Sequence, residues 1–539
     1  MDDPNRASTQ NTEIKIITLF ALGFLLWSAV FIYRTSFIAI DGKRYFCLFD
    51  DAMISMRYAW NLSSGAGLVW NTGEHVQGYT NLLMTLLMSL TTLIFDKSIA
   101  VLAIQILGVG LMLAIGYAMI RIADYIFTDG EIDPSQQKLI RILVFIFALS
   151  YYPLTYWTET GMETGLLTTL LIFGILYAFR FLYNTKARDL FTTAICLGLA
   201  FLTRSDSLIF AVLIWIYMLW EIKKKKIKVQ VSISFFSAVI LYLIFIIGQF
   251  LFQYLYYGEF LPNTYSLKLT GMSLPDRLSS GLVFILPFLV QVSFILLPAI
   301  LDIFMRYRKE KSLLLALFLS SVGYQIYVGG DAWNYWRMIS PTMPLLGILF
   351  IGFVRFSIRS QAEKTRLLKR YGPDTQVILI VLIGLLVVNA YFLPEALFLD
   401  RPFYVSANEH NVNIAVALRE VTTPEATVGI LWAGAIPYFA ERRGIDFLGK
   451  SDRYIAHLAA DLSGKVSANG VKSLPGHNKY DLNYSIKHLR PTYVQSFKWG
   501  TQDLTTWAVS NYVSVEYKGV SLYLIKNSTE VHWDKIGSP

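Results

Sequence analysis

Long runs of apolar residues are the feature that most restricts how this chain of 539 residues can fold. A helix needs about 20 mainly apolar residues to cross a bilayer. The first run, Ile16 to Tyr33, contains no charged residue and exceeds the roughly 7–15 apolar residues of a cleavable signal. We therefore expect it to remain as a span. The candidate spans are 16–39, 80–96, 99–122, 139–152, 163–183, 190–203, 207–221, 229–251, 281–305, 312–328, 340–358 and 375–395.

Composition agrees with a polytopic membrane protein. Hydrophobic residues make up 55% of the chain and charged residues 16%, against roughly 25% charged in soluble domains. The net charge of +9 does not indicate a nucleic-acid partner, because Lys and Arg gather in short loops between apolar runs. The two cysteines, Cys47 and Cys196, form no framework or metal-ligand spacing.

Three basic loops indicate how the chain crosses the membrane. They lie at 223–228, 306–311 and 355–370, and the positive-inside rule places them in the cytoplasm. The last span then runs outward, and residues from about 400 lie outside. Twelve separate crossings would put the N-terminus outside. Since only three residues join 80–96 to 99–122, we count that pair as one crossing, which gives eleven spans and a cytoplasmic N-terminus; the pair within 190–221 is the alternative place for a miscount.

The hydropathy pattern along the whole chain predicts two domains. Residues 1–400 form a transmembrane domain with an outer loop at 41–79. Residues 401–539 form a small extracytoplasmic α/β domain, because hydropathy falls and strand and turn patterns begin. We predict a helix over 408–421 and strands over 427–432, 444–448, 492–497, 512–517 and 520–525, with Lys518-Gly519 as a hairpin turn between the last two.

The strongest chemical signal is the pair Asp50-Asp51 just after the first span. Two carboxylates at the outer membrane edge can accept a hydroxyl proton or hold a cation. A bare Asp-Asp pair is more often the solvated start of a loop. The following residues, up to Asn81, are rich in glycines, aromatic rings and polar groups, a composition that suits a sugar. A divalent metal is compatible with the carboxylates, but no ligand spacing requires one.

An ordered set of motifs runs along the chain: Asp50–Ala59, Gly67–Val69, Asn71, Gly73–Glu74, Gly78–Asn81, Gly161–Thr164, Leu202–Asp206, Tyr256–Thr264, Gly329–Asp331 with Arg337, Gly434–Tyr438, Ile445–Gly449 and Pro475–Asp481. With these motifs the chain resembles bacterial membrane glycosyltransferases of the GT-C fold, and the nearest likeness is to the mycobacterial terminal β-(1→2) arabinofuranosyltransferase family. Four residues depart from the family pattern: Met53, Gln77, Ser205 and Asn478 stand where Tyr, Glu, Pro and Glu are expected. Gln77 removes a carboxylate near the expected site.

This resemblance implies an enzyme of the bacterial inner membrane that moves a sugar, such as a pentofuranose, from a polyprenyl-phosphate donor to a cell-envelope glycan or glycolipid. Asp50 or Asp51 would be the general base or a charge stabiliser. The candidate donor-phosphate residues are Arg57, Arg204, Lys268 and Arg337. The candidate sugar and acceptor residues are Glu74, His75, Tyr79, Asn81, Glu163, Asn263, Asp331 and His477.

Other interpretations stay open for these residues and for the chain. Charged groups at span ends also form ion pairs between helices or extend to the interface. The alternative function is a transporter or flippase of a lipid-linked saccharide, which predicts internal repeats and broken helices in matching halves. A third is a structural protein whose outer domain binds a partner. Transfer of an oligosaccharide to protein is also open within the same fold.

Overall fold

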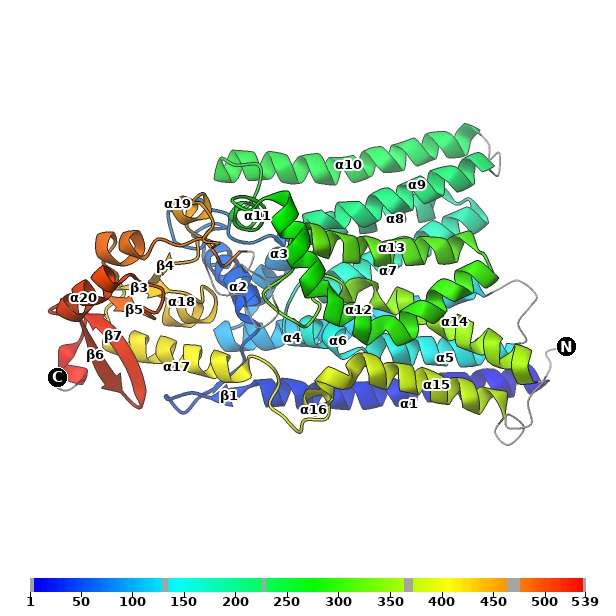
Figure 1. Cartoon of the computed structure of the whole chain (residues 1–539), viewed down its shortest axis with the longest axis horizontal. Helices are drawn as coiled ribbons and strands as arrows, with labels where there is room; N and C mark the ends of the chain where they lie inside the picture. Colours follow the sequence, from blue (N-terminus) through cyan, green and yellow to red (C-terminus); the bar gives the residue numbers. More distant parts are fainter. Residues whose placement is uncertain (1–3, 128–133, 225–228, 363–371, 463–475, 537–539) are drawn as a thin grey trace.

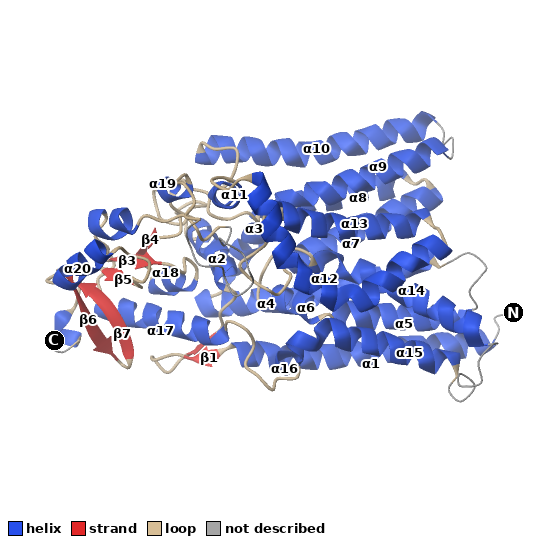
Figure 2. Cartoon of the chain, in the orientation of Figure 1, coloured by secondary structure: helices blue, strands red, loops and turns tan. Residues whose placement is uncertain are grey.

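A computed structural model describes residues 4–127, 134–224, 229–362, 372–462 and 476–536. The molecule is elongated, with a helical bundle at one end and a mixed α/β part at the other (Figure 1). The N-terminus lies at the far end of the bundle and the C-terminus at the opposite tip. Strands are confined to the end that holds the C-terminus (Figure 2).

Among the described residues, eight helices are long and apolar enough to cross a membrane, and the bent pair α5 and α6 makes a ninth. The helices α8 and α13 fall outside that count but pack within the bundle, α8 on α7 and α10, and α13 on α12 and α14. The predicted mainly α, polytopic fold is therefore confirmed. The bundle helices are α1 (Pro4–Thr35), α4 (Lys97–Ile126), α5 (Pro134–Ser150), α6 (Tyr152–Glu159), α7 (Thr164–Asn184), α8 (Ala187–Thr203), α9 (Leu208–Lys224), α10 (Val229–Tyr257), α12 (Leu274–Met305), α13 (Lys309–Tyr327), α14 (Met343–Ala362) and α15 (Pro373–Asn389).

The region 80–122 contains one helix that is long and apolar enough to cross a membrane, α4. Helix α3 (Leu82–Ile94) has only 13 residues and lies beside α2 (Asp50–Ser63), at the end of the bundle that faces the C-terminal part (Figure 1). Helix α4 then begins after Asp96, whose carboxylate accepts hydrogen bonds from the N–H groups of Ser98 and Ile99. This N-cap ends the short connection and starts the true span. The start of α1 and the end of α9 share the opposite end of the bundle (Figure 1).

We call residues 403–536 the C-terminal region. Its five-stranded sheet has the order β4-β3-β5-β7-β6, with β3 parallel to β4 and β5, and β7 antiparallel to β5 and β6. The hairpin β6–β7 turns at Lys518 and Gly519, both with positive φ, as the sequence predicts. The predicted first three strands are shorter in the structure. The elements are α17 (Val405–Val421), β3 (Thr427–Ile430), α18 (Ala435–Ala440), β4 (Arg443–Asp446), α19 (Arg453–Ala456), η5 (Asn483–His488), β5 (Tyr493–Val494), α20 (Gln502–Asn511), β6 (Tyr512–Tyr517), β7 (Val520–Ile525) and η6 (Trp533–Lys535).

The C-terminal region packs directly on the loop that follows the first span. That loop begins with the short hairpin β1 (Phe37–Ile38) and β2 (Arg44–Tyr45) and continues into α2. The Trp70 indole donates to the Ala433 carbonyl at 3.2 Å, and a Cβ on Gly444 would lie 2.1 Å from the same ring. Only a glycine allows this approach. One hydrophobic core runs from the bundle through α2 into α17 and the sheet.

Candidate active site

A cavity of about 150 Å³ lies where the bundle meets the C-terminal region. Seven parts of the chain line it: α2, residues 78–81, residues 162–163 before α7, the turn between α8 and α9, residues 261–269 with the helix α11 (Asn263–Leu269), the end of α13 with the segment after it, and the C-terminal region. Its charged lining residues are Asp51, Glu163, Arg204, Asp206, Lys268, Asp331, Arg337 and Lys450. The same wall also contains Tyr79, Asn81 and His477. Nine of the fourteen predicted site residues therefore surround one space: Asp51, Tyr79, Asn81, Glu163, Arg204, Lys268, Asp331, Arg337 and His477.

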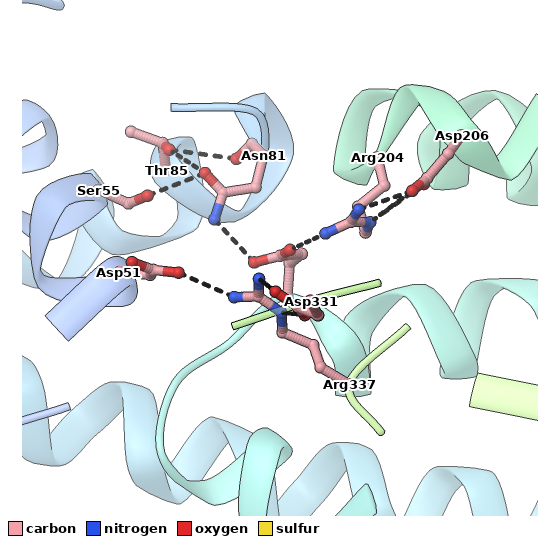
Figure 3. A network of polar contacts seen from close by, with 9 residues as sticks. Asp51, Ser55, Asn81, Thr85, Arg204, Asp206, Asp331 and Arg337 are labelled. Carbon is pink, nitrogen blue, oxygen red and sulfur yellow. Dashed lines mark hydrogen bonds and ion pairs between the residues drawn. The ribbon is translucent and has the colours of Figure 1, made fainter. Parts of the chain in front are cut away.

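Asp51 is held by two cations from distant parts of the chain. Its Oδ2 accepts from Arg337 Nη1 at 2.9 Å and its Oδ1 from Lys450 Nζ at 2.7 Å. Arg337 also donates two hydrogen bonds of 3.1 Å to Asp331 (Figure 3). Burial alone would raise the pKa of Asp51, but the charges of Lys450 and Arg337 outweigh it and hold that pKa well below its usual range.

A second cluster lies beside the first. Arg204 Nη1 is 2.5 Å from Glu163 Oε1, and its other donors bond Asp206 at 2.6–3.2 Å. Asn81 links this cluster to α2, because its amide donates to Glu163 at 3.1 Å and its Oδ1 accepts from Ser55 at 2.9 Å. Figure 3 shows Asn81, Arg204 and Arg337 converging on the same space.

Lys268 and His477 differ from the other polar lining residues. No ion pair or hydrogen bond joins the Lys268 ammonium to any other residue of the described chain, and both ring nitrogens of His477 are buried without a partner there. Burial lowers the pKa of both side chains, that of His477 to about 4. Four carboxylates and four cations line the cavity. Lys268 is the cation left to receive an added anion.

An apolar extension leads from the cavity into the bundle. A small neighbouring cavity of about 20 Å³ shares Arg204 and Arg337 with the first. Its apolar wall is formed by Leu167, Ile209 and Phe210, from the first turns of α7 and α9. The polar site therefore borders a partly apolar space between the helices of the bundle.

Asp50 does not line the cavity, in contrast to its neighbour Asp51. Its carboxylate accepts hydrogen bonds from the N–H groups of Gly434 at 3.2 Å and Ala435 at 2.9 Å. Burial raises its pKa to about 6. Adjacent residues of a helix point about 100° apart, so Asp51, with Ser55 one turn later, lines the cavity while Asp50 joins α2 to α18.

Arg57, predicted as a donor-phosphate residue, likewise does not line the cavity. It lies seven residues after Asp50, on the same side of α2. Its guanidinium donates to the carbonyls of Trp70 at 2.6 Å, Arg442 at 2.8 Å and Pro437. These bonds fasten α2 to the C-terminal region, and Arg57 lines a separate cavity of about 260 Å³ on that side.

Three further predicted residues lie outside the cavity wall. Glu74 pairs with Arg443 at the surface, and the exposed His75 ring packs against Tyr256 with centroids 4.7 Å apart. Asn263 is buried and its amide donates to the Gly449 carbonyl at 3.2 Å. Asn263 thus positions the backbone next to Lys450 instead of contacting a ligand.

Sequence analysis missed Lys450 and Asp206. Asp206 is the last residue of the family-like segment Leu202–Asp206, from which sequence analysis selected only Arg204 as a site residue. Lys450 directly follows the matched segment Ile445–Gly449, and this adjacency was the only signal for it. Within the described residues, no group of three or more His, Cys, Asp or Glu side chains is arranged to hold a metal ion.

Comparisons with known proteins identify the fold. ArnT from Cupriavidus metallidurans in the apo state matches with a TM-score of 0.58 and 11% identity, over 97% of this chain and 99% of that one. ArnT bound to undecaprenyl phosphate matches with a TM-score of 0.58 and 10% identity, over 95% and 99%. An Archaeoglobus fulgidus oligosaccharyltransferase tethered to an acceptor peptide matches with a TM-score of 0.51 and 10% identity, over 97% and 74%.

These similarities define the class of fold: the chain has the GT-C membrane architecture. A domain of unknown function, DUF8728, matches residues 403–531. No curated protein matches the sequence.

Proposed function

We propose that this protein is a membrane glycosyltransferase that uses a polyprenyl-phosphate sugar as donor. The observation behind the proposal is the cavity around Asp51, which combines an anchored carboxylate, an unpaired lysine and an apolar extension. A lipid-linked sugar needs these three features, because it consists of a reacting sugar, a phosphate and a hydrocarbon chain. The similar ArnT was solved with undecaprenyl phosphate and the similar oligosaccharyltransferase with an acceptor peptide.

The donor phosphate binds between Lys268 and Arg337 in this proposal. Among the four cations that line the cavity, Lys268 is the one without an ion-pair or hydrogen-bond partner in the described chain. Arg337 lines the same cavity. Charge-assisted contacts of this kind stabilise the negative charge that develops on the leaving phosphate. Arg204, already bonded to Glu163 and Asp206, acts mainly as a fixed positive charge at the mouth of the apolar extension.

The lipid tail follows the apolar extension past Leu167 and Phe210 into the bundle. This path places the sugar at the opposite side of the phosphate, between α2 and the C-terminal region. Tyr79 and Asn81 contact the sugar hydroxyls there, since both line this part of the cavity. The sugar is a pentofuranose, a choice supported by the resemblance of the sequence motifs.

Asp51 acts as the general base. The acceptor hydroxyl gives its proton to Asp51 as its oxygen bonds to the anomeric carbon. The bond from that carbon to the phosphate oxygen breaks with its electron pair, and polyprenyl phosphate leaves. Positioned proton transfer of this kind typically contributes about 10²–10⁴-fold in rate. Asp50 takes no part, because its carboxylate is occupied by α18.

The acceptor is a cell-envelope glycan or glycolipid, which enters beside the C-terminal region. His477 is suited to bind its hydroxyl group, because a neutral imidazole with two unpartnered nitrogens can both donate and accept a hydrogen bond. The reaction then takes place on the outer face of the bacterial inner membrane. The positive-inside rule supports this side, since α9, α12 and α14, which precede the basic loops in the sequence, end at the opposite end of the bundle (Figure 1).

A transport assay separates this function from the flippase alternative. Purified protein in liposomes receives a panel of radiolabelled undecaprenyl-phosphate sugars, including a pentofuranose, with and without a crude envelope acceptor. We expect label to move from lipid to glycan only when acceptor is present. Movement of labelled lipid between leaflets without any transfer would instead assign the protein as a flippase.

A further inference from the structure

Lys450 and Arg337 both pair with Asp51, but they are held differently. Arg337 is anchored by two further hydrogen bonds to Asp331, each 3.1 Å long. The Lys450 ammonium, within the described chain, contacts only Asp51, at 2.7 Å. Arg337 is therefore fixed in place, whereas Lys450 ends a flexible four-carbon side chain with a single partner.

The backbone of Lys450 is fixed even though its ammonium is not. Asp446 accepts from the N–H groups of Leu448 at 3.0 Å and Ser451 at 2.7 Å. Asn263 donates to the Gly449 carbonyl, and Gly78 packs so closely that a Cβ there would lie 2.7 Å from the Lys450 oxygen. Any movement of the positive charge must therefore come from rotation of the side chain.

The contacts of Asp51 in this structure oppose a role as base. A general base works best when its pKa lies near the operating pH, and two neighbouring cations keep that of Asp51 far below it. A donor phosphate that enters the cavity adds negative charge near Lys268 and Arg337. Lys450 lines the same cavity, so the phosphate and Asp51 compete for its ammonium.

We propose that Lys450 is shared between Asp51 and the donor phosphate: it holds Asp51 in the empty site and turns to the phosphate when the donor binds. This inference rests on the proposed function and extends it. Turning Lys450 away leaves Asp51 with one cation and frees its Oδ1 for the acceptor hydroxyl. The same movement adds a positive charge where the leaving phosphate develops its negative charge. Donor binding thus switches on the base, and the hydroxyl proton is accepted only when a leaving group is present.

A double-mutant cycle on lipid binding tests the sharing of Lys450. The probe is undecaprenyl phosphate, and its affinity for the purified full chain in nanodiscs is measured without turnover. We expect Asp51→Asn to tighten binding by about 5-fold or more, because the competitor for Lys450 is removed. In a Lys450→Met background the same substitution should have little effect. In a Lys268→Met background it should keep its full effect, although overall binding is weaker.

Each outcome of the cycle has one meaning. Equal tightening by Asp51→Asn with and without Lys450 would overturn the sharing while leaving the proposed function intact. Absence of undecaprenyl phosphate binding in the wild type and all variants would overturn the proposed function and this inference together. Compared with Lys450→Met, the Lys450→Arg variant should regain both undecaprenyl phosphate binding and sugar transfer, because it keeps a mobile cation. If Lys450→Met unfolds on heating well below the wild type, Lys450→Gln completes the cycle with a smaller change in polarity.

Discussion

Asp51 Oδ1 lies 2.7 Å from Lys450 Nζ, although 399 positions separate the two residues in the sequence. The pair joins the loop after the first span to the C-terminal region. The cavity is therefore completed by both parts, because the bundle alone lacks Lys450 and His477. In a protein truncated before the C-terminal region, Asp51 should keep only one of the two cation partners that it has in the described structure, Arg337.

Asp50 should matter for stability more than for chemistry. Asp50→Ala leaves the N–H groups of Gly434 and Ala435 buried without their acceptor, which costs on the order of 2 kcal/mol. We expect a lower thermal unfolding temperature than in Asp503→Ala, a matched control whose carboxylate is 80% exposed. Equal unfolding temperatures for the two variants would show that the contact with α18 contributes nothing.

Arg57→Lys should weaken the attachment of α2 to the C-terminal region. A lysine has three donors and cannot reach the carbonyls of Trp70, Pro437 and Arg442 in the fork geometry of arginine. We expect thermal unfolding at lower temperature than in Arg443→Lys, whose side chain is 62% exposed. Lipid-phosphate affinity per folded molecule should not change. A well-folded Arg57→Lys that no longer binds undecaprenyl phosphate would return Arg57 to the phosphate site.

Lys268→Met should lower the affinity for undecaprenyl phosphate by about tenfold, the effect of losing one charge-assisted contact of about 1.4 kcal/mol. Its stability should change little, because no ion pair of the described structure is lost. Lys479→Met provides the matched control, since the buried Lys479 ammonium bonds Ser266, Thr270 and Ala456 within 3.1 Å. That variant should lose stability and keep its affinity. The reverse pattern would exclude Lys268 from the phosphate site.

His477 should link stability to pH. Burial lowers the pKa of its imidazole in the folded protein to about 4, from an ordinary value of 6.5. The unfolded chain therefore binds a proton that the folded chain excludes between these values, so stability rises with pH across this window. The contribution is complete above about pH 6.5 and is lost as pH falls toward 4. The unfolding temperature of wild type minus that of His477→Asn, measured from pH 4.5 to 7.5, should rise with pH. A difference that stays flat would contradict a buried neutral His477.

The membrane fold could be predicted from the sequence because a bilayer imposes a length and a composition on every span. The turn at Lys518-Gly519 could also be predicted, because a two-residue hairpin turn needs residues that adopt positive φ, as both do here. The extent of β5 was predicted less well: the local pattern indicates a strand over 492–497, whereas only Tyr493 and Val494 pair with β3 and β7.

Only part of the candidate site could be predicted from the sequence. The Asp50-Asp51 pair located it, and the helix period of α2 contained the information that separates the two residues: Ser55 shares a face with Asp51, and Arg57 with Asp50. Which face meets the cavity depends on α18, more than 370 positions away in the sequence. Lys450 could not be found by pattern, because a lysine after a glycine in a polar loop usually faces solvent.

The transfer assay on two aspartate variants tests the central claim most directly. Wild type, Asp50→Asn and Asp51→Asn are reconstituted in lipid with a radiolabelled undecaprenyl-phosphate pentofuranose and a crude cell-envelope acceptor. Loss of the base should reduce transfer by Asp51→Asn about 10²–10⁴-fold, although this variant should bind undecaprenyl phosphate at least as tightly as the wild type. Asp50→Asn should retain transfer in proportion to its folded fraction. Full transfer by Asp51→Asn, or loss of transfer confined to a well-folded Asp50→Asn, would contradict the account.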